Sequence, residues 1–121
     1  MVSSVSFSKY GKTFQEKLAF LILDDRVFSD RMMEVLNIEF LEFKYLQVFI
    51  DKIFEHKKKY NTHPSIDTLT TILKSELNEY NEALQKQVRG YFARVLSAVN
   101  VLESSEYIKD TALYFCRKQK L

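Results

Sequence analysis

The segment from Phe40 to Leu73 constrains the fold of this chain most strongly. Its first half repeats apolar residues at spacings of three and four, at Leu46, Phe49, Ile50, Ile53 and Phe54. This spacing predicts one apolar stripe along a helix of about 17 residues, roughly 26 Å long. A helix of that length needs other elements to cover its stripe, so the rest of the chain must pack around it.

The only proline of the chain ends this helix. Pro64 disfavours helical geometry at His63, and Ser65 is a residue type typical of a helix N-cap. A second apolar stripe then begins at Ile66 and continues through Leu69. We therefore expect a long helix, a sharp turn and a shorter helix, which together form a corner for a small domain.

Composition supports an all-α fold. The 121 residues contain only two glycines and one proline, too few turn residues for a typical all-β protein. A chain of this length is one domain by size. We expect a small globular helical bundle followed by an antiparallel helical hairpin, with about six helices in all.

Helix signals divide the chain into three parts. Residues 1–12 are expected to form a flexible N-terminal arm, although Phe7 and Tyr10 offer side chains that can dock on the core. Residues 13–80 form the globular helical subdomain, which begins with a capping box at Thr13 and Glu16. Residues 81–121 are expected to form the hairpin. The chain stops within a helical pattern, so we expect either a piece of a longer protein or a last helix that docks on a partner.

Residues 82–102 carry two neighbouring apolar rows. The first has heptad spacing and comprises Leu84, Val88, Tyr91, Val95, Ala98 and Leu102. The second comprises Phe92, Leu96 and Val99. One row is explained by contacts inside the hairpin, whereas the other needs the globular body or a second subunit as its cover. We expect self-association through this hairpin.

Catalytic and cofactor motifs are not found in the sequence. Gly11-Lys12-Thr13 lacks the upstream glycine of a phosphate-binding loop. The soft metal ligands His56, His63 and Cys116 have no metal-site spacing. We expect no catalytic residue, no metal and no cofactor in this chain.

Two basic clusters are candidates for contact with nucleic acid. They comprise Lys57, Lys58 and Lys59 in one helix and Arg117 and Lys118 near the C-terminus. Either cluster could contact phosphates, but a solvated helix end explains them as well. The net charge of +2 is small for a nucleic-acid-binding domain.

Cysteine content and hydropathy bear on location. Cys116 is the only cysteine, so an internal disulfide is excluded and a reducing cytoplasm is expected. No apolar run approaches 18 residues, so no membrane span is expected.

Several segments resemble the N-terminal domain of the DnaB-type hexameric replicative helicases, particularly their phage branch. They are Leu21-Ile-Leu-Asp24-Asp25, Val27-Phe28, Phe40 with Glu42-Phe43, the helix Lys44–Tyr60, Asn61-Thr-His-Pro-Ser-Ile-Asp67-Thr-Leu69, and Tyr107-Ile-Lys-Asp110 with Phe115-Cys-Arg-Lys-Gln. The resemblance covers nearly the whole chain and consists mainly of helices and apolar positions. The last of these segments is similar to the one that leads into the family's linker, which implies that residues 81–121 lead toward a linker.

The resemblance implies a non-catalytic collar domain that acts in DNA replication. Hairpins pair between subunits into a trimer of dimers, and the collar docks primase or the helicase loader. ATP and Mg belong to a separate motor domain, and contact with DNA is indirect. The implied subunit-interface residues are Val88, Tyr91, Phe92, Val95, Leu96 and Val99, with Ile108, Ala112 and Phe115 opposite. The location would be the cytoplasm of the host cell. The alternative is a free-standing small helical protein that binds nucleic acid or a host factor through its lysine clusters.

Overall fold

The computed structural model describes residues 5–98 and 104–120, and these residues form an all-α fold. The α-helices are α1 (Gly11–Asp24), α2 (Arg26–Val35), α3 (Lys44–Tyr60), α4 (Ile66–Ser75), α5 (Glu82–Ser97) and α6 (Ser105–Gln119). Two short 3-10 helices, η1 (Phe7–Tyr10) and η2 (Ile38–Phe40), complete the described elements. The expectation of an all-α fold with about six helices is confirmed.

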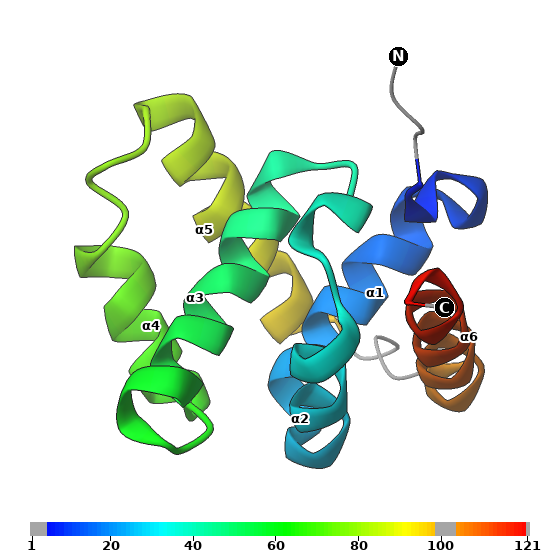
Figure 1. Ribbon diagram of the computed structural model, residues 1–121. Coiled ribbons are helices and arrows are strands. Elements are labelled where there is room, and N and C mark those ends of the chain that lie inside the picture. Colours follow the sequence, from blue (N-terminus) through cyan, green and yellow to red (C-terminus); the bar gives the residue numbers. More distant parts are fainter. Residues whose placement is uncertain (1–4, 99–103, 121) are drawn as a thin grey trace.

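Helices α1 and α3 pack against each other in the middle of the molecule (Figure 1). On the far side of α3 lie α4 and α5, and on the far side of α1 lie α2 and α6. The core between these helices is aliphatic and aromatic, and its fully buried side chains include Leu18, Ile22, Leu46, Phe49 and Ile53. The stripe predicted from the sequence of α3 therefore lies at the centre of the core.

The corner after α3 forms as predicted. Asn61 adopts a left-handed conformation with φ 54° and ends the helix. Pro64 is buried, and the Ser65 hydroxyl accepts a hydrogen bond from the Thr68 amide at 3.0 Å. These local signals define the bounds of both helices because each acts within a few residues of the turn.

The N-terminal segment differs from the expected flexible arm. Helix α1 begins at Gly11, two residues before Thr13, so Thr13 lies inside the helix and is not its cap. Phe7 is fully buried, and its ring centroid lies 4.8 Å from that of Phe115 and 5.9 Å from that of Phe14. Aromatic packing therefore makes residues 7–12 part of the globular body. Residues 1–4 lie outside the described part of the chain.

The last two helices do not form the expected antiparallel hairpin over the described residues. Helix α5 packs on α3 and α4, whereas α6 packs on α1 and α2, on the other side of the molecule (Figure 1). Helix α3 covers Tyr91 of the first apolar row and Phe92 of the second, because the Phe49 ring contacts both of their rings. Val88, Tyr91 and Val95 of the heptad seam are thus part of the core and not a contact between the last two helices. Leu84 is half-buried, Ala98 is exposed, and Leu102 lies outside the described residues.

None of the helices in the described ranges combines the length and the apolar character needed to cross a membrane.

Candidate functional site

Most of the predicted subunit-interface residues are buried within the chain itself. These are Val88, Tyr91, Phe92, Val95, Ile108, Ala112 and Phe115. Leu96 differs, because 45% of its surface is exposed. Val99 lies outside the described residues. The prediction of an interface made of these residues is therefore wrong for the buried ones, since core side chains cannot also face a second subunit.

Tyr91 illustrates this core role. Its ring meets that of Phe49 edge-on, with centroids 5.0 Å apart, and its hydroxyl donates to the main-chain oxygen of Glu16 at 2.5 Å. Burial raises the pKa of Tyr91 well above its ordinary value. The residue therefore joins α5 to both α1 and α3.

An ion pair on the edge of the core reinforces this junction. Arg94 donates to both carboxylate oxygens of Glu16, each at 3.0 Å, and the Tyr45 hydroxyl donates to the same carboxylate at 2.5 Å. Burial opposes ionisation of Glu16, but the bonds from Arg94 and Tyr45 outweigh it and lower the pKa. The cluster holds three helices together.

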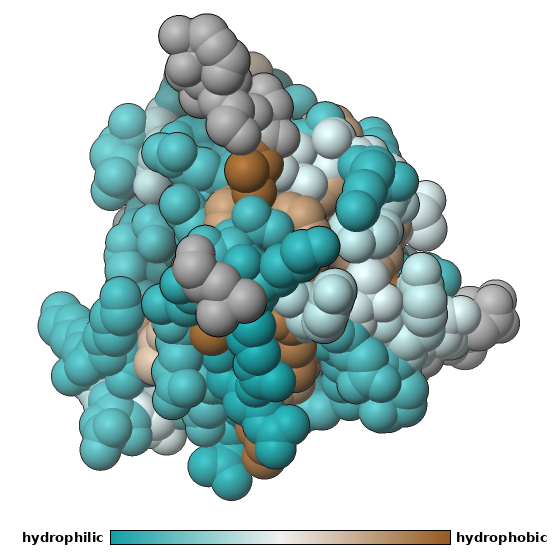
Figure 2. Space-filling model, turned by 45° about the vertical axis from the view of Figure 1, so that its right-hand side comes forward, coloured by the Kyte–Doolittle hydropathy of each residue, from teal (hydrophilic) through white to brown (hydrophobic). Residues whose placement is uncertain are grey.

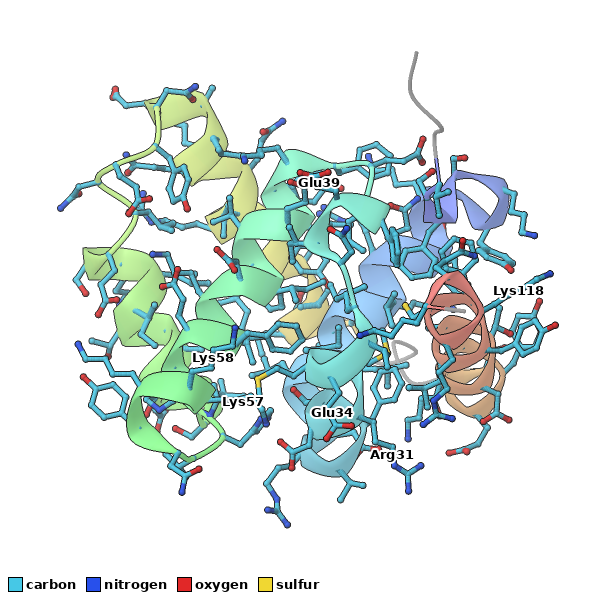
Figure 3. All side chains as sticks on the ribbon, viewed as in Figure 1. Arg31, Glu34, Glu39, Lys57, Lys58 and Lys118 are labelled. Carbon is cyan, nitrogen blue, oxygen red and sulfur yellow. The ribbon has the colours of Figure 1, made fainter. Side chains whose placement is uncertain are left out.

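The structure divides the first lysine cluster. Lys57 is 6% exposed, whereas Lys58 and Lys59 are exposed. The Lys57 ammonium forms an ion pair with Asp30 of α2 and donates to Nδ1 of His63 at 3.1 Å. The prediction that Lys57 contacts nucleic acid is wrong, because its charge is already paired inside the fold. Figure 3 shows Lys57 and Lys58 on the same end of α3.

The second basic cluster lies beside a groove between α2 and α6. Arg117 and Lys118 are exposed, as predicted for a surface cluster. The groove has a volume of about 530 Å³ and is lined by Arg31, Asp110, Leu113, Tyr114, Arg117 and Lys118. The Lys118 ammonium lies 5.9 Å from the centre of the Tyr114 ring. This geometry makes the groove the best candidate binding site among the described residues.

Sequence reasoning missed Arg31 and Tyr114 as members of this groove. Arg31 comes from α2, and its proximity to α6 is a tertiary contact that spacing along the chain does not reveal. Tyr114 carried a usable signal. It follows Tyr107 by seven residues, so both lie on one side of the helix, away from Ile108 and Ala112.

A second groove lies between α3 and α4. It has a volume of about 410 Å³ and is lined by Lys52, Glu55, His56, Lys59, Tyr60, Thr68, Thr71, Ile72 and Glu76. Lys52 there pairs with Glu55 at 3.4 Å and with Glu79 at 3.9 Å. Because the positive charge of Lys52 is balanced by these carboxylates, this groove attracts a charged ligand more weakly than the groove between α2 and α6 does.

Groups with metal-binding or nucleophilic character have structural roles where the structure describes them. No three His, Cys, Asp or Glu side chains are grouped to hold a metal within residues 5–98 and 104–120. Cys116 is buried, and burial raises the pKa of its thiol to about 12, which keeps the thiol protonated. His63 lies in the turn, as predicted, where both of its ring nitrogens are hydrogen-bonded.

No family model, no curated protein and no solved structure matches this chain.

Proposed function

We propose that this chain is the non-catalytic N-terminal domain of a DnaB-type hexameric replicative helicase of the phage branch. In this proposal the domain supports subunit dimerisation and hexamer assembly, and it docks primase or the helicase loader during DNA replication. The motor domain would carry ATP and Mg, and contact of the present chain with DNA during assembly would be indirect.

The observation that carries the proposal is the corner between α3 and α4. The segment with the strongest resemblance folds as one helix from Lys44 to Tyr60, a turn at Pro64 and a second helix capped by Ser65. His63 from this turn bonds the main-chain oxygen of Leu23 at the end of α1. Segments that carry the resemblance, though distant in sequence, thus contact each other in one all-α body, as the proposal requires.

The surface that would assemble subunits must differ from the buried rows of α5 and α6. Large apolar side chains that remain exposed are scattered over the described chain: Val5, Val27, Tyr60, Ile66, Leu96, Tyr107 and Tyr114. Figure 2 shows one face, on which apolar residues form narrow strips between hydrophilic ones. We expect association of the isolated domain to be weak and dependent on concentration, since no extended apolar patch drives it on that face.

Leu96 is the residue on which we place this association. It belongs to the row for which the globular body or a second subunit is the expected cover, and it stays 45% exposed on α5. Ile66 on α4 has the same exposed fraction of 45% and provides a matched control. Because both positions are half exposed, a charged substitution at either leaves the core intact.

Sedimentation equilibrium over a range of protein concentrations tests the assembly. The wild-type chain and Ile66→Glu are expected to increase in average mass with concentration, whereas Leu96→Glu stays monomeric. If the wild-type chain is strictly monomeric at the highest concentration, as the Leu96→Glu variant is expected to be, the proposed assembly is contradicted.

A further inference from the structure

We propose that the groove between α2 and α6 binds single-stranded nucleic acid, with phosphates on Arg31, Arg117 and Lys118 and a base stacked on Tyr114. This site is separate from Leu96 and does not depend on how subunits assemble. It also differs from the cluster at the end of α3, where Lys57 is buried.

The charge of the groove favours a polyanion. Arg31 from α2 lines the groove together with Arg117 and Lys118 from α6, and Asp110 is the only carboxylate of the lining. Elsewhere in the described chain several buried or half-buried cations are paired with carboxylates, whereas these three form no ion pair with a described carboxylate. Their positive charge therefore remains available to phosphate groups.

One exposed aromatic ring, that of Tyr114, lies next to these cations, and a second lies on the same side of α6. Tyr114 is 67% exposed even with the Lys118 ammonium near its ring, and Tyr107 is 63% exposed. Seven residues separate the two tyrosines, which places them about 10 Å apart along one side of α6. Flat rings beside cations are the combination that binds unpaired bases, because each base has a face that can stack.

The lining also argues against a helical peptide as the occupant. A docked amphipathic helix needs a row of aliphatic contacts, but Leu113 is the only aliphatic residue in the groove and is itself buried. Asp110 opposes phosphate, but a carboxylate also accepts hydrogen bonds from the amino groups of bases. Single-stranded nucleic acid therefore offers matching contacts to more of the lining residues than an acidic helical peptide does.

Fluorescence anisotropy with a labelled oligodeoxycytidine of about 15 nucleotides, whose bases carry amino groups, tests the site. The wild-type chain is expected to bind with an affinity that falls as salt rises. Tyr114→Ala should weaken binding by about tenfold or more, from the loss of one stacked base. Arg31→Gln with Arg117→Gln should weaken binding and reduce its dependence on salt, since two phosphate contacts are lost.

The chain offers a matched control on α3. Tyr60 is 58% exposed, with the Lys59 ammonium 5.3 Å from its ring centre, so it has the same local chemistry as Tyr114. Tyr60→Ala should bind like the wild type. Leu96→Glu should also bind like the wild type, which separates this site from the proposed assembly. Circular dichroism checks that each variant retains its helices.

Two outcomes would overturn the inference. One is binding that is absent, or equal in the Tyr114→Ala and Tyr60→Ala variants, which would leave the groove without a role. The other is equally tight binding of polyglutamate, lost on Arg31→Gln but not on Tyr114→Ala, which would show that the groove recognises acidic peptides by charge alone.

Discussion

The ammonium of the buried Lys57 donates a hydrogen bond to Nδ1 of His63 over 3.1 Å. On the other side of the ring, Nε2 lies 2.6 Å from the main-chain oxygen of Leu23. A carbonyl can only accept and an ammonium can only donate, so the ring must be neutral with its proton on Nε2. The fold thus fixes both the tautomer and the charge of His63.

This contact predicts a pH dependence of stability. Burial is the main cause that lowers the pKa of His63 below its ordinary value of 6.5, and the charge of Lys57 adds to it. The hydrogen bond to the Leu23 carbonyl and the charge of Asp30 favour the charged ring, whereas the charge of Arg26 disfavours it. A lowered folded-state pKa means that the unfolded chain binds the proton more readily. The contribution of neutral His63 is complete above pH 6.5 and declines as the pH falls below that value.

Urea denaturation between about pH 5 and pH 7.5 measures this effect. The wild-type chain should lose stability on acidification relative to His63→Gln, which keeps a donor and an acceptor but cannot ionise in this range. The Asp30 carboxyl does not interfere, because Lys57 lowers its pKa below 3.8. Parallel pH curves for the two proteins would show that His63 has no such role.

Adjacent lysines should respond differently to truncation. Lys57→Ala is expected to lower the free energy of unfolding by about 1–3 kcal/mol, because it removes buried packing and leaves Nδ1 of His63 without its donor. Lys58→Ala, one residue away and exposed, should change stability by less than about 0.5 kcal/mol. Denaturant titration of both variants checks this, and equal effects would mean that Lys57 is not held by Asp30 and His63.

Tyr91 should contribute to the stability of a single chain. Tyr91→Phe keeps the ring against Phe49 but leaves the Glu16 carbonyl without its buried donor, for a loss of about 1–2 kcal/mol. Tyr114→Phe, at a 67% exposed position, should be within about 0.5 kcal/mol of wild type. Thermal unfolding at a concentration where the chain is monomeric measures both. If Tyr91→Phe alters association but not the stability of the monomer, Tyr91 belongs to a subunit interface after all and the core role is contradicted.

The two glycines should give opposite results on substitution by alanine. Gly90 lies inside α5 with open space where a Cβ would be added, so Gly90→Ala should stabilise the chain by about 0.5–1 kcal/mol. Gly11 has φ +87° and ψ 173°, a conformation that costs other residues about 1–3 kcal/mol. Gly11→Ala should therefore destabilise the chain. Melting temperatures of both variants test these two expectations. A Gly90→Ala variant that melts at a lower temperature than the wild type would contradict the helical position of Gly90 with open space for a Cβ.

Local signals in the sequence predicted the elements of the fold well. Pro64 and Ser65 mark the corner because their effects act within one turn of the chain. The partners of each helix were harder to predict, since an apolar row such as that of Tyr91 and Phe92 packs equally well on any apolar neighbour. Only the tertiary fold shows that Phe49 covers this row.

The candidate site was predicted in part. Arg117 and Lys118 are exposed, as a charged helix end suggests, but Arg31 joins them only through tertiary packing. The burial of Lys57 had a signal in the sequence, because it follows Ile53 by four residues and so continues the buried stripe of α3. From the sequence alone, a lysine at such a position is predicted to be exposed, because a partner such as Asp30 is visible only in the fold.

The reading frame beyond the codon for Leu121 tests the central claim most directly. For an N-terminal domain of a DnaB-type helicase, sequencing this frame should reveal a downstream motor domain with a glycine-rich loop that ends in Lys-Thr or Lys-Ser, the signature of a site for nucleotide phosphates. A frame that ends at Leu121, or that continues into a domain without such a loop, would contradict the assignment.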